Sequence, residues 1–449
     1  MTKASDTANI LKQPFTNTLG TSNYRAGVNA GDTIASGGNY NVTIGDDAGT
    51  ALTTGDANVA IGFEALKTED DNSNNVAVGY QALKTLNAGA DSYNVAVGYQ
   101  AGTAITTGIQ NTLIGSLSGD AITDADYNVG VGIGSLGANV LGSSSTAIGT
   151  NSLFYQNPSS AASMLNVAVG YTAGFNVTTG DQNAIVGALA GDALTTGNKN
   201  AVLGYNALGG GTTYDGNTAI GYEALKVANN TDGPDGNNTA VGASAGNAVT
   251  TGLKNVIIGV SSAPSLTTGT DNICIGRQAD VNASGAANQI TIGIDINAGG
   301  NNNFSFGKAS NVVTNDFDSD ANWSRSSDKR KKREIYDQEL GLDFVNDLRT
   351  VNFQWKPSNE FPKEWKDYSE ENNMDTDVIM HGFIAQEVKE VLDKHSSERD
   401  SKFSGWKEGE DGMQHTSREM FVIPLIKAVQ ELSAQVDALK EEIKELKNG

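Results

Sequence analysis

A glycine that returns every seventeen residues constrains the fold of this 449-residue chain more than any other feature. Of the fourteen intervals between the fifteen glycines from 45 to 293, eleven are 17 residues, one is 19 and two are 21. Val or Ile precedes each glycine except at Leu203, and Asn stands four residues before it in thirteen units, with Ser145 and Gln289 as the substitutes. Such self-similarity indicates a repeat architecture in which each unit is one structural turn.

The residue types within each unit predict a β-solenoid. Val and Ile favour a short strand, and glycine supplies the backbone angles that end it at a bend. Asn at a fixed slot can hydrogen-bond from coil to coil in a ladder. No unit can bury its own apolar face, so the coils must stack. Fifteen coils at roughly 4.8 Å each predict a rod of about 70 Å.

One slot of the repeat holds aromatic residues, namely Tyr80, Tyr99, Tyr171, Tyr205 and Tyr222. We expect these rings to stack and to pack coils or subunits together. A platform on which sugar rings stack is the alternative interpretation.

Composition argues against several classes of function. The net charge of −22 disfavours nucleic acid and anionic membranes as partners. The single cysteine, Cys274, lies in an apolar strand slot and makes an intrachain disulfide framework impossible. The sequence contains no run of about 18 apolar residues of the length that spans a membrane, so we expect no membrane insertion. The N-terminus lacks a continuous apolar core, so we expect no secretory signal peptide. His381, His395 and His415 are too scattered for a metal site, so we expect neither a metal nor a cofactor.

The chain divides into four segments, and the expected fold class is mainly β. Residues 1–38 lack the repeat and suit an attachment or capping segment, while 39–296 form the solenoid. Residues 297–323 are rich in Asn, Asp and Ser and are expected to form a neck. Residues 324–449 have an ordinary globular composition and predict a small α+β domain, which ends in a coiled coil over about 420–447.

The coiled coil is predicted from an apolar heptad at the end of the chain. Leucines recur every seven residues, and a β-branched residue precedes each of them by three. This a/d pattern indicates self-association, although it does not fix the number of chains. The positions are Val422, Leu425, Val429, Leu432, Val436, Leu439, Ile443 and Leu446.

The repeat units resemble two known kinds of sequence. Units such as NAVLGYNAL, residues 200–208, are similar to the head repeats of trimeric autotransporter adhesins and to repeats in marine phage tail-fibre proteins. Those adhesin heads are trimeric left-handed parallel β-rolls. The resemblance therefore implies that three chains lie side by side, although the 17-residue period is longer than the adhesin unit.

Three motifs in the last segment carry a second resemblance. They are SDKRKK at 327–332, HGFIAQEV at 381–388 and VIPLIKAVQEL at 422–432. In this order they resemble the endosialidase-type intramolecular chaperone family, which trimerises phage fibres and spikes and then releases itself by autoproteolysis. The resemblance implies that Ser327 is the nucleophile, that Lys332 is the base, and that the chain is cut between Ser326 and Ser327.

The chemistry of such a dyad is plausible on physical grounds. A serine hydroxyl becomes a good nucleophile when an adjacent base takes its proton. Burial and neighbouring cations both favour the unprotonated form of a lysine amine. A solvated basic run or a nucleic-acid patch is the alternative reading of the cationic residues 329–333.

These observations favour a homotrimeric phage tail fibre, assembled in the host cytoplasm and carried in the virion. We expect its N-terminus to bind tail or baseplate proteins and its rod to contact a host-surface receptor or glycan. The self-cleaving serine peptidase would act once in cis, with no turnover enzyme evident. A tailspike that depolymerises glycans and a bacterial surface adhesin are the alternatives, the first of which requires paired carboxylates.

Overall fold

The computed structural model describes residues 20–229, 235–317, 327–363, 365, 368–372, 374, 376–396, 403–409 and 412–448. The chain folds as two compact units, and the boundary between them in the sequence falls between Ser326 and Ser327. Each unit is described separately below.

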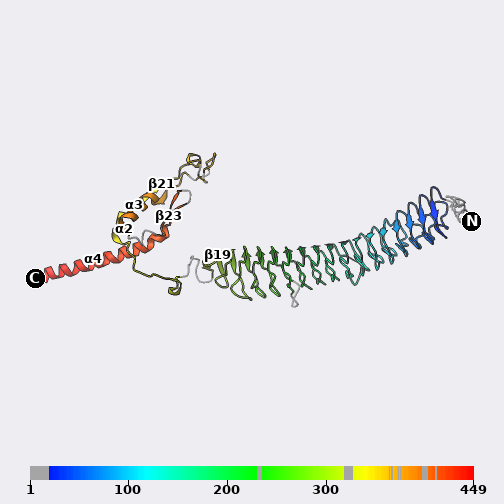
Figure 1. Ribbon diagram of the computed structural model, residues 1–449, viewed down its shortest axis with the longest axis horizontal. Helices are drawn as coiled ribbons and strands as arrows, with labels where there is room; N and C mark the ends of the chain where they lie inside the picture. The colour runs from blue at the N-terminus through cyan, green and yellow to red at the C-terminus, as the bar shows by residue number, and fades with distance from the viewer. Residues whose placement is uncertain are drawn as a thin grey trace, which may run out of the picture. The chain divides into compact units, whose positions relative to one another are not determined.

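The first unit is a solenoid whose coils stack along one direction (Figure 1). Most coils contribute one three-residue strand, and the strands build an 18-stranded sheet that is parallel except for its last pair. The expected mainly β fold with a solenoid rod is confirmed. The strands are β1 (Tyr24–Ala26), β2 (Val42–Ile44), β3 (Val59–Ile61), β4 (Val76–Val78), β5 (Val95–Val97), β6 (Thr112–Ile114), β7 (Val129–Val131), β9 (Thr146–Ile148), β11 (Val167–Val169), β12 (Ala184–Val186), β13 (Ala201–Leu203), β14 (Thr218–Ile220), β15 (Thr239–Val241), β16 (Val256–Ile258), β17 (Ile273–Ile275), β18 (Ile290–Ile294), β19 (Asn303–Lys308) and β20 (Asn311–Asp316).

The recurrent glycine is required because the bends of successive coils touch through their backbones. Gly115 has φ +136°, a conformation that residues with a Cβ rarely adopt. A Cβ added there would lie 2.4 Å from the carbonyl oxygen of Gly132 in the next coil. The glycine column therefore sets both the bend and the close spacing of the coils.

The asparagine slot forms the predicted ladder inside the rod. In most coils, the Oδ1 of the Asn in this slot accepts a hydrogen bond from the backbone N–H of the Asn in the next coil, as between Asn41 and Asn58 at 2.9 Å. In most coils its Nδ2 also donates to the turn carbonyl fourteen residues on, as from Asn41 to Gly55 at 2.7 Å. Where Ser145 interrupts the series, Gln156 Oε1 accepts from both Ser145 and Asn166.

Strand geometry gives the sheet two different faces. Successive side chains alternate across a strand, so the middle residue of nearly every rung from β2 onward is buried inside the coil, as Ala60 and Ala77 are. The first and third residues, mostly Val, Ile or Thr, point outward and remain half-buried or exposed. The expected aromatic stack also forms on the surface, with ring centroids 5.4 Å apart for Phe63 and Tyr80 and 5.3 Å apart for Tyr80 and Tyr99.

Both ends of the rod differ from the segment boundaries expected from the sequence. The first rung in the described part of the chain is β1, which pairs with β2, so the solenoid starts before residue 39 and includes part of 1–38. The sequence signal was hidden because Ala26, rather than Val or Ile, precedes Gly27. Within the expected neck, 297–323, β19 continues the parallel sheet and β20 folds back antiparallel on it.

The described part of the second unit has a small core built by two helices, one long terminal helix and two antiparallel strand pairs. Phe344 lies at the centre of the core, with its ring parallel to Phe421 at 6.4 Å. Leu340, Val388 and Leu392 complete the buried cluster. The elements are η1 (Lys329–Lys331), α2 (Leu342–Asp347), β21 (Val351–Phe353), η2 (Ser358–Glu360), β22 (Met380–Gly382), α3 (Ala385–His395), β23 (Trp406–Glu408), β24 (Gln414–Thr416), η4 (Arg418–Phe421) and α4 (Val422–Asn448).

The terminal helix α4 is held only at its beginning. Pro424 and Ala428 are its buried residues, and Glu431 Oε2 accepts the backbone N–H of Leu342 at 2.7 Å. All eight apolar heptad positions are exposed, from 41% at Val436 to 76% at Leu446. Among the described residues, no helix combines the length and apolarity needed to cross a membrane.

Candidate functional site

The structure brings together the two residues that the sequence pairs as a dyad. Lys332 Nζ lies 2.6 Å from Ser327 Oγ and donates a hydrogen bond to it. This distance is within the range expected for a nucleophile and its base. The other side of the expected cut, Ser326, lies outside the described residues.

A single 3₁₀ turn returns the chain from Ser327 to Lys332. Asp328 caps this turn: its Oδ1 accepts the backbone N–H of Arg330 at 2.8 Å. The Arg330 side chain also donates to both carboxylate oxygens, from Nε to Oδ1 at 3.0 Å and from Nη2 to Oδ2 at 2.7 Å. The backbone N–H of Lys332 closes the turn on the carbonyl of Lys329 at 3.0 Å. The Asp328–Arg330 pair therefore positions the dyad.

The segment 327–337 carries a net positive charge, and its side chains are exposed. Arg330 holds the pKa of the Asp328 carboxyl below its usual range, first through the side-chain hydrogen bonds and then through the backbone bond. Every residue from 327 to 337 is exposed in the single chain. The geometry therefore supplies the hydrogen bond of a Ser–Lys dyad, while the exclusion of water that would favour an unprotonated amine is not supplied by this chain alone.

Comparison with known families bears on the same segment. Residues 327–397 match the family model Peptidase S74, described as chaperone of endosialidase. The match begins at Ser327, the first residue of the second compact unit. We find no match to this chain among curated proteins or among solved structures.

The second of the three C-terminal motifs, at 381–388, contributes to the packing of this unit. His381 lies on β22 opposite Asn352 on β21, and Phe383 packs against Phe421 at a ring distance of 4.9 Å. The motif also forms one wall of a groove of about 880 Å³ that Trp355 and Arg418 help to line. The third motif, at 422–432, begins α4 and lies beyond the matched residues.

The histidines do not gather into a site among the described residues. His395 Nε2 lies 2.6 Å from Asp347 Oδ2, which also accepts from Lys394 at 2.5 Å. These bonds lower the pKa of the Asp347 carboxyl, with Lys394 contributing most. They join α2 to the end of α3 and have a structural role.

Sequence reasoning missed two features that the structure reveals. The first is Arg330, whose pairing with Asp328 is signalled only by their i, i+2 spacing. The second is a group of three carboxylates in the rod, formed by Glu69, Asp70 and Asp71. Its signal was present, because a glutamate stands in a slot that is apolar in the neighbouring coils.

Proposed function

We propose that this protein is a homotrimeric tail-fibre-type rod whose C-terminal domain aligns three chains during assembly and then cuts itself loose before Ser327. The observation that carries the proposal is the 2.6 Å hydrogen bond between Lys332 Nζ and Ser327 Oγ, at the first residue of a domain that matches the chaperone of endosialidase model. The solenoid that precedes this domain is the part that remains after cleavage.

Uncovered apolar surface on both units supports self-association. On α4 the whole a/d stripe of the heptad is exposed, which is typical of a coiled-coil helix without its partners. A large exposed apolar surface marks an interaction site. On the rod, the outward residues of successive strands form apolar columns, exposed at Ile114, Ile148, Val167, Val186, Leu203, Ile258, Ile292 and Phe306.

Assembly would also complete the cleavage site. In the trimer, neighbouring chains cover the segment 327–337, exclude water and favour the unprotonated amine of Lys332. The amine then takes the proton of Ser327 Oγ, and Oγ attacks the carbonyl carbon of Ser326. An ester forms as the peptide C–N bond breaks, and the proton passes to the leaving nitrogen. Water hydrolyses the ester, leaving a carboxylate at Ser326 and a free amino group at Ser327.

The remaining parts of the proposal concern the ends and the surface of the rod. We place the N-terminal segment, of which residues 1–19 lie outside the described residues, against phage tail or baseplate proteins. The exposed surface of the rod would meet a host receptor or glycan. The mature protein would belong to the virion, after assembly in the host cytoplasm.

Denaturing electrophoresis with N-terminal sequencing tests the proposal directly. The wild-type protein should give a fragment that begins at Ser327, and native mass measurement should give three chains per particle. Ser327→Ala and Lys332→Ala should remain full-length, whereas Ser326→Ala and Lys331→Ala, the neighbouring controls, should still be cut. A Ser327→Ala protein that releases the 327–449 fragment would reject the dyad.

A further inference from the structure

The coil that begins at Gly62 differs from its neighbours at one buried slot. The residue seven after the glycine is apolar and buried in the adjacent coils, as at Leu52, Leu86 and Ile105. In this coil the slot holds Glu69, whose side chain is also completely buried. A carboxylate inside a stack of aliphatic residues is unfavourable unless something compensates its charge.

The surrounding turn does not fully satisfy Glu69. Its Oε1 accepts the backbone N–H groups of Asp70 and Asn72, each at 3.1 Å. Its Oε2 is buried and has no hydrogen-bond partner among the described residues. The Nδ2 of Asn72 is also buried and unpartnered, but a single neutral donor does not offset a cluster of negative charges.

Two further carboxylates converge on Glu69. Asp70 and Asp71 each offer an oxygen, and these atoms and an oxygen of Glu69 all lie within 4.8 Å of one another. Asp70 is half-buried and Asp71 is exposed, so the cluster opens to solvent on one side. Contact with Asp70 raises the pKa of the Asp71 carboxyl, and burial raises the pKa of Glu69 to about 7. Like charges are therefore held together without an opposite charge.

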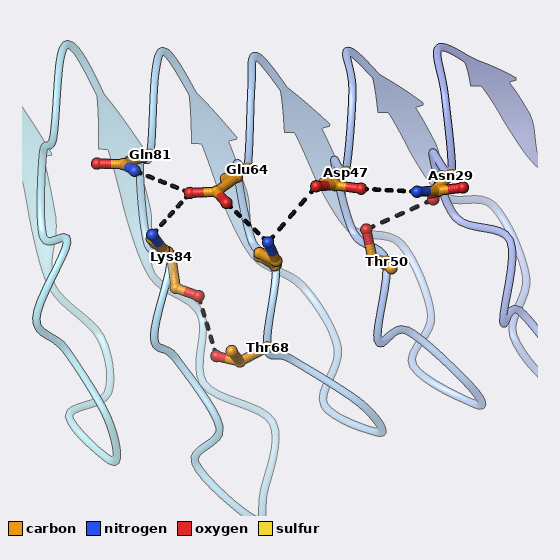
Figure 2. A network of polar contacts seen from close by, with 8 residues as sticks. Asn29, Asp47, Thr50, Glu64, Thr68, Gln81 and Lys84 are labelled. Carbon is orange, nitrogen blue, oxygen red and sulfur yellow. Dashed lines mark hydrogen bonds and ion pairs between the residues drawn. The ribbon is translucent and has the colours of Figure 1, made fainter.

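The nearby lysines pair with other carboxylates. Figure 2 shows Glu64 between Gln81 and Lys84, and Lys84 Nζ lies 2.6 Å from Glu64 Oε2. Lys67 Nζ lies 2.7 Å from the same carboxylate and 3.5 Å from Asp47. These bonds lower the pKa of Glu64 to about 2, the opposite of the shift at Glu69 in the same coil. No ion pair to Glu69, Asp70 or Asp71 occurs among the described residues.

A catalytic carboxylate pair does not account for this arrangement. A glycosidase acid and its partner must both touch the glycan, but Glu69 is completely buried. An ordinary solvated acidic turn does not account for it either, because it would leave the carboxylates in water and well apart. A cation fits both the buried unpartnered oxygen and the convergence of three carboxylates.

We propose that Glu69, Asp70 and Asp71 form a binding site for a hard divalent cation, with Ca²⁺ as the best-suited ion. Ca²⁺ takes carboxylate and water oxygens at about 2.3–2.6 Å and accepts irregular geometry, whereas Mg²⁺ requires a near-ideal octahedron. The ion enters past Asp71 and keeps water on the exposed side. It also fixes the turn against the preceding coil, where the carbonyl oxygen of Asp70 accepts from Thr53 N at 2.6 Å and from Thr53 Oγ1 at 2.9 Å.

Calorimetric titration of the chelator-treated full-length protein with CaCl₂ tests the site. We expect one saturable site per chain and an unfolding temperature raised by several degrees. MgCl₂ in a parallel titration should bind at least tenfold more weakly. Asp71→Asn, an exposed change that leaves the core intact, should weaken Ca²⁺ binding at least tenfold, and Glu69→Gln should abolish it.

The matched control is Asp124→Asn. Asp124 occupies the same exposed slot, nine residues after its glycine, but the buried slot of its coil holds Ile122. Binding should be unchanged in this variant. Absence of saturable binding in the wild type, or equal binding by the wild type and Asp71→Asn, would overturn the proposal; in the first case Glu69 instead holds a proton.

Discussion

The rod and the C-terminal unit solve the problem of burying apolar surface in different ways. In the rod, every coil is covered by the coils before and after it, and the buried Asn ladder repeats the same bonds along its length. In the C-terminal unit, five residues form the buried apolar cluster. Most of α4 extends away from that cluster with its apolar stripe uncovered.

This difference indicates a division of labour between the two units. A stack of equivalent coils has one weakness, which is register: chains that pair one coil out of step form nearly the same contacts. The heptad stripe of α4 spans only residues 422–446, so under the proposed function this short helix would align three chains before the coils lock. On the same proposal, the contacts between the stacked rods would then hold the chains, and the aligning unit would no longer be required.

The largest expected effect comes from placing a charge on the apolar stripe of α4. Leu432→Asp buries a carboxylate in the proposed interface of every chain, at a cost of several kcal/mol per assembly. We expect the trimer and the cleavage before Ser327 to be lost together. Light scattering after size-exclusion chromatography measures the first, and denaturing electrophoresis measures the second.

Ala434→Asp is the control for that variant, since residue 434 is exposed and lies off the a/d stripe. It should assemble and cleave like the wild type. A Leu432→Asp protein that stays trimeric would show that the rod alone aligns the chains, and would remove the proposed division of labour.

The next largest effect is expected at the backbone contact between coils. Gly115→Ala forces a Cβ to within 2.4 Å of a carbonyl oxygen in an unfavourable backbone conformation. Overpacking and backbone strain each cost about 1–3 kcal/mol. Denaturant unfolding should show a rod destabilised by about 3 kcal/mol or more, while the C-terminal unit keeps its fold.

Gly89→Ala provides the comparison, because a Cβ at Gly89 meets nothing within 4 Å. Its φ of +70° leaves some strain, so a loss of about 1 kcal/mol is expected. Equal losses in both variants would mean that the coil-to-coil approach at Gly115 relaxes easily.

The rod was predictable from the sequence because its physics is local and repeated. The glycine interval, the Val or Ile before it and the Asn slot each recur, so the strand, the bend and the ladder follow from any one unit. The starting rung was missed where Ala26 weakened the pattern. The antiparallel return of β20 was missed because its residues, 311–316, lack the glycine of the repeat.

The secondary structure of the C-terminal unit was predictable only where its apolar residues recur at a regular spacing. The apolar heptad spacing marked α4. The Ser327–Lys332 contact came from a resemblance, since a separation of five residues leaves many geometries open. The carboxylate cluster at Glu69 was missed because only folding shows that its oxygen is buried without a partner.

A smaller effect is expected from breaking one rung of the Asn ladder. Asn183 Nδ2 donates to Gly197 O at 2.9 Å, and its Oδ1 accepts from the backbone N–H and Nδ2 of Asn200, each at 3.0 Å. Asn183→Ala leaves these buried groups unpaired, at a cost of about 2 kcal/mol. Asn183→Ser, which copies the natural Ser145, should cost less. Denaturant midpoints give the order, and equal midpoints for wild type and Asn183→Ala would contradict it.

The smallest expected effect is on the pH dependence of stability, which distinguishes the buried carboxylate of Glu69 from the ion-paired carboxylate of Glu64 in the same coil. Burial, with the charge of Asp70 adding to it, raises the pKa of Glu69 from its ordinary value of about 4.5 to about 7. Between pH 4.5 and 7, Glu69 therefore holds a proton in the folded rod but has released it in the unfolded chain. The contribution of Glu69 to the free energy of unfolding accordingly falls as the pH rises from about 4.5 to 7. Glu69→Leu, which copies Leu52 and Leu86, should remove that slope.

Thermal unfolding of the full chain at pH 5, 6, 7 and 8, in chelator, measures the slope as the difference between wild type and variant. Contributions common to the two proteins cancel in that difference. Glu223→Gln is the control, because the hydrogen bond from Lys226 lowers the pKa of Glu223. The contribution of Glu223 to stability is therefore lost as the pH falls, which is opposite in sign to the contribution of Glu69. If Glu69→Leu leaves the pH dependence unchanged, the Glu69 carboxylate is solvated in the folded rod. The proposed contrast between Glu69 and Glu64 would then be wrong.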